Sequence, residues 1–446
     1  MHHRKDSRPV IRRMIATTLA VAALGCSAGA YAQTDKEQAL EARVAELEKL
    51  VQQLVAEKQA APAPVAAAPA KPAGTPVQAT SITPNAAPGT TFLLTGFVKA
   101  DANFTSTSDG EIADNSIGRD FYVPGTIPVG GDDEDTDLNA HVKQSRVNFG
   151  TDTILEGGDK LMTRFEIDFY GSALGDQRIS NTYAPVVRHA FVQWRNWLVG
   201  QTWSNFMDVA TLPEAADFIG TTDGTSFVRQ PQVRYTNGGF SISLENPETT
   251  ITPFGGGARI TTDDSTLPDL TARYAWKGTW GHLAVAGLVR ELAYETTGVG
   301  AIDDSTMSAA FSLSGKFNFG QDDIRWMLLG GNLGRYVALN FANEAVLDAN
   351  GELEAIDGYA GFIAYRHMWS PKLRSTLSYA MEEYDNDTDL TGTGANKSSD
   401  SWTINLFYSP IPKLDIGAEY RRANRELESG VDGDMDRLQF TTKYSF

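Results

Sequence analysis

The sequence predicts an all-β fold, a 16-stranded antiparallel transmembrane β-barrel, preceded by a short coiled-coil helix and a Pro/Ala-rich linker. Strands of roughly 8–13 residues with alternating apolar and polar side chains recur along residues 91–446, joined alternately by short turns and long polar loops. No run of 18 or more apolar residues follows the amino-terminal leader, so a transmembrane helix is not expected. Tryptophans lie beside the short turns, and tryptophan is enriched at the membrane–water interface of membrane proteins.

Residues 1–32 are expected to be a secretory signal peptide. A basic start precedes an apolar run over residues 14–24, and residues 30–32 read Ala-Tyr-Ala, which fits a cleavage site. The chain's single cysteine, Cys26, lies inside this leader. Lipidation of Cys26 is an alternative, but the residues before it form a poor lipobox. Removal of the leader leaves a chain without cysteine, so disulfides are not expected.

The charge balance is acidic, with 56 Asp and Glu residues against 38 Lys and Arg residues. The leader holds five of the basic residues and one acidic residue, which leaves 55 acidic against 33 basic residues in the mature chain. A nucleic-acid partner is therefore not expected. The acidity is explained either by solubility alone or by acidic loops at a lipopolysaccharide surface, where divalent cations bridge anions.

Residues 33–58 are predicted to form a periplasmic coiled-coil helix of about three heptads, with valine and leucine alternating along its seam. This helix either packs on its own barrel or associates with other copies. We favour association, because residues 59–90 form an Ala/Pro-rich spacer that separates the helix from any other core. The a and d residues alone favour a coiled coil of two helices, whereas the context of an outer-membrane barrel favours three. The seam consists of Leu40, Val44, Leu47, Val51 and Leu54.

Residues 91–446 are predicted to form the transmembrane barrel. In the clearest strand, residues 161–169, Phe165 and Ile167 alternate with Arg164 and Asp168. The charged face of such a strand must contact water, and its apolar face must be covered by an apolar environment. A count of these runs gives about sixteen strands, an even number, as in single-chain bacterial barrels.

The short turns lie at the same end of the predicted barrel as the linker, which makes that end periplasmic. A β-sandwich core would also hold tryptophan, but it would not need so many strands of one alternating pattern. The tryptophans beside the short turns are Trp194, Trp197, Trp276, Trp280 and Trp369.

The stretch from Val186 to Tyr235 organises the predicted barrel. It begins with two short alternating strands around a tight turn at Arg195-Asn196. A connection of about 22 residues follows, far longer than a usual hairpin loop. This connection, residues 205–226, contains a helix-like start at Pro213. We expect it to fold into the barrel and narrow a pore.

Arginines alternate with the apolar residues of the predicted wall, which places them on the lumen side. A guanidinium group offers a planar fork of donors that suits carboxylates. The inward loop is expected to place acids opposite, so that a transverse field crosses the pore. Alternatively, several of these arginines pair with Glu166, Asp168 or loop acids and brace the wall. The predicted basic wall is Arg146, Arg164, Arg234, Arg273, Arg366 and Arg374, and the predicted constriction-loop acids are Glu214, Asp217 and Asp223.

Enzyme and metal chemistry find little support in the sequence. The mature chain has four histidines, none of them in a zinc-binding H-E-x-x-H pattern. Residues 385–389 imitate the start of a calcium loop, but Leu390 replaces the glycine and Asn396 stands where the bidentate glutamate belongs. No catalytic, cofactor-binding or metal-ligating residues are predicted. A Ser-His-acid site assembled across strands stays an open alternative.

The amino-terminal helix and Pro/Ala linker, the stretch RHAFVQWRNWLVGQTWSNF from Arg188, and the end of the chain on Tyr444 and Phe446 resemble the DcaP-like outer-membrane porins. The Arg188 stretch is the most specific part, and the resemblance covers nearly all of the mature chain. It implies a homotrimer of sixteen-stranded barrels in the bacterial outer membrane, in contact with lipid and lipopolysaccharide. It also implies uptake of small organic anions such as dicarboxylates, without a cofactor.

The sequence therefore predicts a passive outer-membrane diffusion channel for small hydrophilic solutes, with a preference for organic anions. Two alternatives stay open. One is a general porin that prefers cations, because the loops are strongly acidic. The other is a structural tether, in which the barrel anchors an amino-terminal segment that contacts peptidoglycan.

Overall fold

The computed structural model describes residues 89–171 and 181–446, together with Arg43, Glu46, Lys49 and Ala87. The chain divides into two compact units, Met1–Pro84 and Asn85–Phe446. In the first unit the three described residues are helical and exposed, and they lie outside the predicted seam. The predicted signal peptide, the seam and nearly all of the linker fall outside the described residues.

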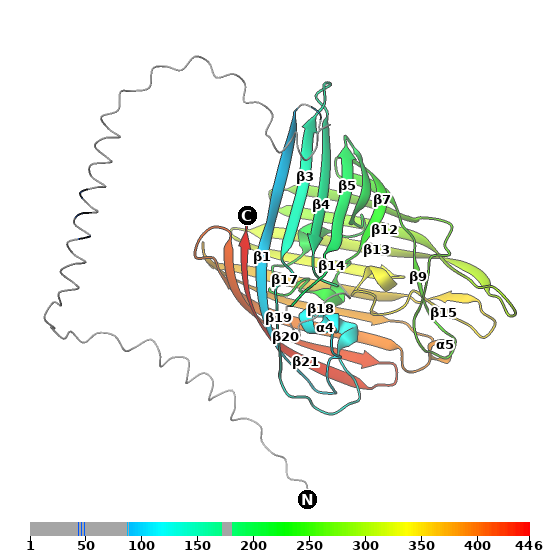
Figure 1. Ribbon diagram of the computed structural model, residues 1–446. Coiled ribbons are helices and arrows are strands. Elements are labelled where there is room, and N and C mark those ends of the chain that lie inside the picture. The colour runs from blue at the N-terminus through cyan, green and yellow to red at the C-terminus, as the bar shows by residue number, and fades with distance from the viewer. Residues whose placement is uncertain (1–42, 44–45, 47–48, 50–86, 88, 172–180) are drawn as a thin grey trace, which may run out of the picture. The chain divides into compact units, whose positions relative to one another are not determined.

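The second unit is a closed antiparallel β-barrel (Figure 1). One sheet contains seventeen strand segments, of which β2 and β3 are two halves of a single strand beside β1, so the barrel has sixteen strands. This confirms the predicted 16-stranded barrel. The segments are β1 (Thr90–Thr107), β2 (Asp137–His141), β3 (Arg146–Ile154), β4 (Lys160–Asp168), β5 (Val186–Trp194), β6 (Trp197–Trp203), β7 (Arg229–Asn237), β8 (Phe240–Glu245), β11 (Asp269–Gly278), β12 (Gly281–Glu295), β13 (Asp303–Phe319), β14 (Asp322–Gly331), β17 (Gly358–Ser370), β18 (Leu373–Tyr384), β19 (Asn396–Tyr408), β20 (Leu414–Leu427) and β21 (Asp432–Ser445).

The first strand closes the barrel by pairing with the last. The register of β1 and β21 runs from Phe97 opposite Ser445 to Thr107 opposite Met435. On its other side β1 pairs with β3 and then with β2. Where those halves are interrupted, the backbone N–H of Lys99 donates to the Ser145 hydroxyl at 3.0 Å, so a side chain replaces the missing backbone partner of Lys99.

Side chains alternate across the wall as the sequence predicts. In β12, Val285 and Val289 are 42% and 45% exposed, whereas Ala284 and Leu288 between and beside them are buried. An outer face of exposed apolar side chains is stable only against lipid. None of the helices in the described part of the chain has the length and apolar character needed to span a membrane.

The short turns carry the expected aromatic residues. Trp194 and Trp197 are register partners at the β5–β6 turn, and they are 43% and 51% exposed. Arg195 in that turn has a φ of 51°, a left-handed conformation that a tight hairpin requires. The predicted hairpin is therefore confirmed.

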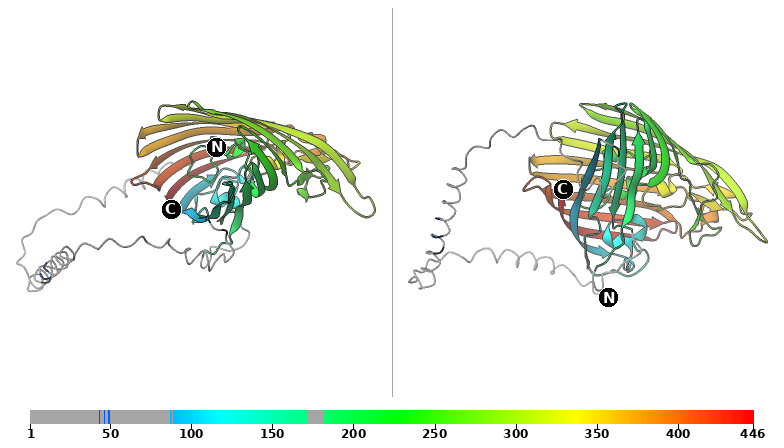
Figure 2. Two further views of the ribbon diagram at one scale, coloured as in Figure 1. Left: turned by 90° about the horizontal axis from the view of Figure 1, so that it is seen from above. Right: turned by 45° about the horizontal axis from the view of Figure 1, so that its top comes forward.

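The long loops lie at the other end of the strands, and several of them contain short elements. The loops used below are L1 (residues 108–136), L3 (204–228), L4 (246–268), L5 (296–302), L6 (332–357) and L7 (385–395). Figure 2 shows the strands curving around segments that fold inward. The loop elements are α4 (Ile117–Asp120), η1 (Pro124–Thr126), η2 (Val209–Thr211), η3 (Thr222–Gly224), β9 (Thr249–Thr252), β10 (Ile260–Thr262), η4 (Gly334–Tyr336), β15 (Ala345–Leu347), β16 (Leu353–Ala355) and α5 (Thr388–Thr391).

The prediction of a helical start at Pro213 is wrong, because residues 212–221 are irregular. Side chains of the wall take the backbone bonds that a helix would make. The backbone N–H of Ala216 donates to Glu419 at 2.8 Å, and its carbonyl accepts from Lys99 at 2.6 Å and from Gln439 at 3.0 Å. Docking against the wall therefore replaces the local hydrogen bonds of a helical turn.

Candidate functional site in the barrel lumen

L3 and L6 fold into the lumen and share a hydrophobic core, which we name the L3–L6 core. Phe206 of L3 and Tyr336 of L6 are 1% and 0% exposed, with ring centroids 5.9 Å apart. The backbone N–H of Phe227 donates to the Tyr336 carbonyl at 2.9 Å, which joins the two loops directly. The core also includes Leu333, Val337 and Phe341 of L6 and the inward wall residues Leu288, Met327, Leu329 and Phe362.

A second buried cluster joins L3 to L1. Phe121 of L1 packs edge-on against Phe218 of L3 at 5.0 Å, and Tyr170 lies against both rings. Met207 and Ile219 of L3 are buried in the same cluster. L1, L3 and L6 therefore occupy the lumen as packed structure.

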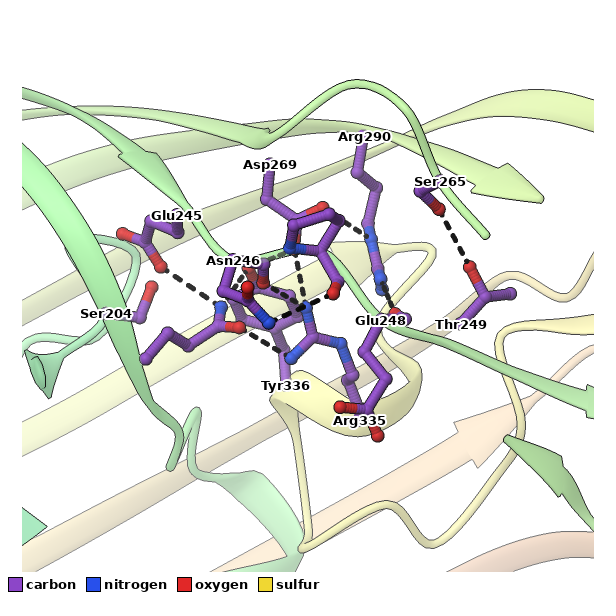
Figure 3. A network of polar contacts seen from close by, with 12 residues as sticks. Ser204, Glu245, Asn246, Glu248, Thr249, Ser265, Asp269, Arg290, Arg335 and Tyr336 are labelled. Carbon is purple, nitrogen blue, oxygen red and sulfur yellow. Dashed lines mark hydrogen bonds and ion pairs between the residues drawn. The ribbon is translucent and has the colours of Figure 1, made fainter. Parts of the chain in front are cut away.

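A network of charges fixes L6 to the wall (Figure 3). Asp269, at the loop end of β11, lies 3.3 Å from the guanidinium of Arg290 and 2.7 Å from that of Arg335. The Tyr336 hydroxyl also donates to Asp269 at 2.7 Å. Arg290 forms a second ion pair with Glu344, and the side chains of Arg290, Asp269 and Glu344 are fully buried. Two wall residues and three residues of L6 thus form one buried network.

The predicted basic wall lies on the lumen side, but most of its arginines have an acid beside them. The carboxylate in each pair cancels much of the positive field that a free guanidinium group would create in the lumen. The pairs are Arg146 with Asp168 at 3.6 Å, Arg164 with Asp152 at 2.9 Å, Arg366 with Asp323 at 2.6 Å, and Arg374 with Asp415 at 2.9 Å.

Arg234 and Arg273 are the least compensated of the six. Arg234 donates to the Gln232 side chain at 2.8 Å and to a backbone carbonyl, both of them neutral acceptors. Arg273 donates to the Met207 carbonyl at 3.0 Å, and the carboxylate of Asp208 lies 3.9 Å away. These two guanidinium groups therefore carry most of the unbalanced positive charge of the predicted set.

The register places these two arginines close together. Arg234 of β7 stands opposite Ser243 of β8, and Arg273 of β11 stands opposite Ser241 on the other side of the same strand. Arg234 lies in the half of β7 that ends at a short turn, and Arg273 lies near the middle of β11, which also ends at a short turn. The structure thus groups two of the predicted residues on one part of the wall.

The predicted constriction-loop acids anchor L3 to the wall. Glu214 accepts two hydrogen bonds from the guanidinium of Arg374, at 2.7 and 2.6 Å. Asp217 is 4% exposed and accepts from the backbone N–H of Tyr122 at 3.1 Å. Asp223 is fully buried and accepts from Ser399 at 2.9 Å. Asp217 and Asp223 are thus enclosed between loop and wall, and they do not face Arg234 and Arg273 across open space.

The sequence interpretation missed L6 and the arginines associated with it. The segment NLGRYVALNFANEAV, residues 332–346, carries apolar residues without the two-residue period of a strand. Apolar residues in a long loop predict burial, and this signal could have identified an inward fold. No local pattern identifies the ion pairs of Arg290 and Arg335, because their partners come from distant parts of the chain. Among residues 89–171 and 181–446 no group of His, Cys, Asp or Glu is arranged to hold a metal ion.

Comparisons with known proteins agree with this architecture. The family described as DcaP outer membrane protein matches residues 27–446. The crystal structure of the outer membrane channel DcaP of Acinetobacter baumannii is similar with a TM-score of 0.65 and 24% identity, over 80% of this chain and 98% of that chain. In-vitro folded OmpT of Vibrio cholerae, in its trimer form, has a TM-score of 0.50 and 12% identity, over 80% and 100% of the two chains. No curated protein matches the chain.

Proposed function

Because the chain belongs to the DcaP outer membrane protein family and is an outer-membrane porin, we propose that it forms a passive diffusion channel for small hydrophilic solutes, with a preference for small organic anions such as dicarboxylates. We also propose that it is a homotrimer. The trimer form of the similar barrel OmpT supports this assembly. Solutes follow their own gradient, so the channel needs neither cofactor nor catalytic residue.

The observation that supports anion preference is the pair of weakly compensated arginines, Arg234 and Arg273. The chain carries a formal net charge of -18, so exposed acids alone would favour cations. A solute inside the lumen is nevertheless closest to the charges of the wall, where the low-dielectric surroundings strengthen each interaction. Two guanidinium groups on one part of the wall therefore favour an anion at that depth.

A channel that prefers cations is the second candidate, and the mouth of the barrel favours it. Asp132, Asp133, Glu134 and Asp135 of L1 are all exposed. Their potential is screened within about 8 Å at physiological ionic strength, whereas charges inside the lumen are screened less. We therefore expect the lumen to determine the selectivity at physiological salt and the mouth to contribute more at low salt.

The reversal potential in a planar bilayer under a KCl gradient tests this proposal. The wild-type channel is expected to prefer chloride and to appear in three equal conductance steps. In the variant Arg234→Gln/Arg273→Gln, the anion-to-cation permeability ratio should fall roughly three- to tenfold, because two lost charges change the energy of a passing ion by on the order of 1 kcal/mol.

The matched control is Arg195→Gln/Arg422→Gln. It removes the same two charges from exposed side chains, one at a short turn and one on the outer face of β20. This control should leave the permeability ratio unchanged. A cation-selective wild-type channel would overturn the anion preference, and equal effects of the two double variants would overturn the role of Arg234 and Arg273.

A further inference from the structure

The loop end of the barrel contains a pocket of about 610 Å³ that belongs to none of the sites above. Its walls come from L4, L6 and L7 and from the end of β20. The lining includes Arg259 of L4 and Arg425 of β20, and it contains no aspartate or glutamate among the residues that the structure describes. A lining with two cations and no carboxylate is unusual in a chain with a net charge of -18.

Within the described part of the chain, the guanidinium group of each pocket arginine donates its hydrogen bonds to neutral oxygens. Arg259 donates to the Asn343 side chain and to the Asn340 carbonyl, the latter at 2.6 Å. Arg425 donates to the Asn396 side chain at 3.0 and 2.8 Å and to the Ile127 carbonyl at 2.7 Å. These bonds orient both cations without neutralising them.

The amides that hold the arginines are themselves fixed. The amide nitrogen of Asn343 donates to the Thr252 hydroxyl at 2.8 Å, and that of Asn396 donates to the Phe341 carbonyl at 2.6 Å. Each arginine is thus held by an amide that L6 or L4 anchors. Groups fixed before a ligand arrives lose little conformational entropy when it binds.

Two glutamates near the pocket already have partners outside its lining arginines. Glu428 accepts a hydrogen bond from Asn386 at 2.8 Å, and Glu344 is paired with Arg290. L4 and L7 also approach closely enough that a side chain at Gly392, which has a φ of 69°, would meet the Gly255 carbonyl at 2.9 Å. The pocket therefore has glycines of L4 and L7 in its wall, and neither of its arginines forms an ion pair among the residues that the structure describes.

We propose that this pocket is an extracellular capture site for a small carboxylate-bearing solute, which binds between Arg259 and Arg425 before it enters the lumen. The inference rests on the proposed anion-channel function and adds a second, outer site to it. Carboxylate oxygens accept paired hydrogen bonds from guanidinium groups. An outer positive site in an acidic surface raises the local anion concentration and hence the rate of entry from outside.

Succinate block of single channels, measured with succinate on one side of the bilayer at a time, tests this proposal. The association rate from the loop side should fall roughly three- to tenfold in Arg259→Gln/Arg425→Gln, within the range that electrostatic steering supplies. The association rate from the short-turn side should stay unchanged. Succinamide, a neutral analogue of the same size, should not block from either side.

Two further variants separate charge from fold. Arg259→Lys/Arg425→Lys keeps both charges and should retain most of the wild-type rate. Arg119→Gln/Arg422→Gln removes two charges from the loop end outside the pocket, from side chains that are paired with acids, and should leave the rate unchanged. The capture site is overturned if Arg259→Gln/Arg425→Gln behaves like this control, if both sides lose rate equally, or if succinate does not block the wild-type channel. A cation-selective wild-type reversal potential would instead overturn the proposed function, so the two failures are distinguishable.

Discussion

Replacement of L6 by a tight turn is expected to raise the single-channel conductance about two- to threefold. Gly331 of β14 and Gly358 of β17 are register partners, so their strands are already adjacent where L6 begins and ends. Residues 333–356 can therefore be replaced by Asn-Gly, a dipeptide that closes a hairpin between neighbouring strands. The change removes the L6 side of the L3–L6 core, which leaves L1 and L3 as the loops that still narrow the lumen.

The barrel should survive this change, because its wall is held by interstrand hydrogen bonds that L6 does not provide. Conductance in planar bilayers is the measurement, and a heat-resistant folded band in electrophoresis checks the fold. Deletion of Gly298, Val299 and Gly300 from L5 is the control, since Val299 is fully exposed and lies outside the core. Unchanged conductance in the L6 variant would show that L6 lies outside the conducting path.

The alternation of side chains made the wall predictable from sequence. A strand between lipid and a polar interior repeats every two residues, and Phe165 against Arg164 shows this pattern whatever the rest of the chain does. The Arg195-Asn196 turn and the long connection after β6 were equally local signals. The number of strands and the order of turns and loops followed from them.

The contents of the lumen were less predictable because they depend on contacts between distant segments. Alternation places Arg366 on the inner face, but only the β14–β17 register shows that Asp323 stands opposite and pairs with it. The irregular backbone at Pro213 has the same cause, since Glu419 of β20 supplies the hydrogen bond that a helix would make. The enclosure of Asp217 and Asp223 likewise depends on docking of L3 against the wall. Local patterns therefore predicted the face of the wall on which each residue lies. They did not predict its ion-pair or hydrogen-bond partner.

Substitution of Arg290 by glutamine is expected to release L6 from the wall. Arg290 is 1% exposed and lies between Asp269 and Glu344, both of them fully buried. The substitution leaves two buried carboxylates with Arg335 as their remaining cation, and loss of one partner of a buried ion pair costs about 3–5 kcal/mol. The loss mainly destabilises the docked state of L6, because β12 keeps its backbone pairing with β11 and β13.

Trypsin cleavage after Arg335 measures this release, because the side chain of Arg335 is 11% exposed when L6 is docked. When opening is fast compared with cleavage, the cleavage rate follows the population of the open loop. The rate in Arg290→Gln should therefore rise about a hundredfold or more, since each 1.4 kcal/mol corresponds to a factor of ten.

The double variant Arg290→Gln/Glu344→Gln shows whether charge imbalance is the cause. It removes one cation and one anion, so its cleavage rate should fall well below that of Arg290→Gln, which is the signature of coupled residues. A surface substitution, Arg422→Gln, should leave the rate at the wild-type value. If Arg290→Gln is cleaved no faster than wild type, the core contacts of Tyr336 and Phe341 hold L6 without the ion pairs, and the buried charges then serve the wall alone.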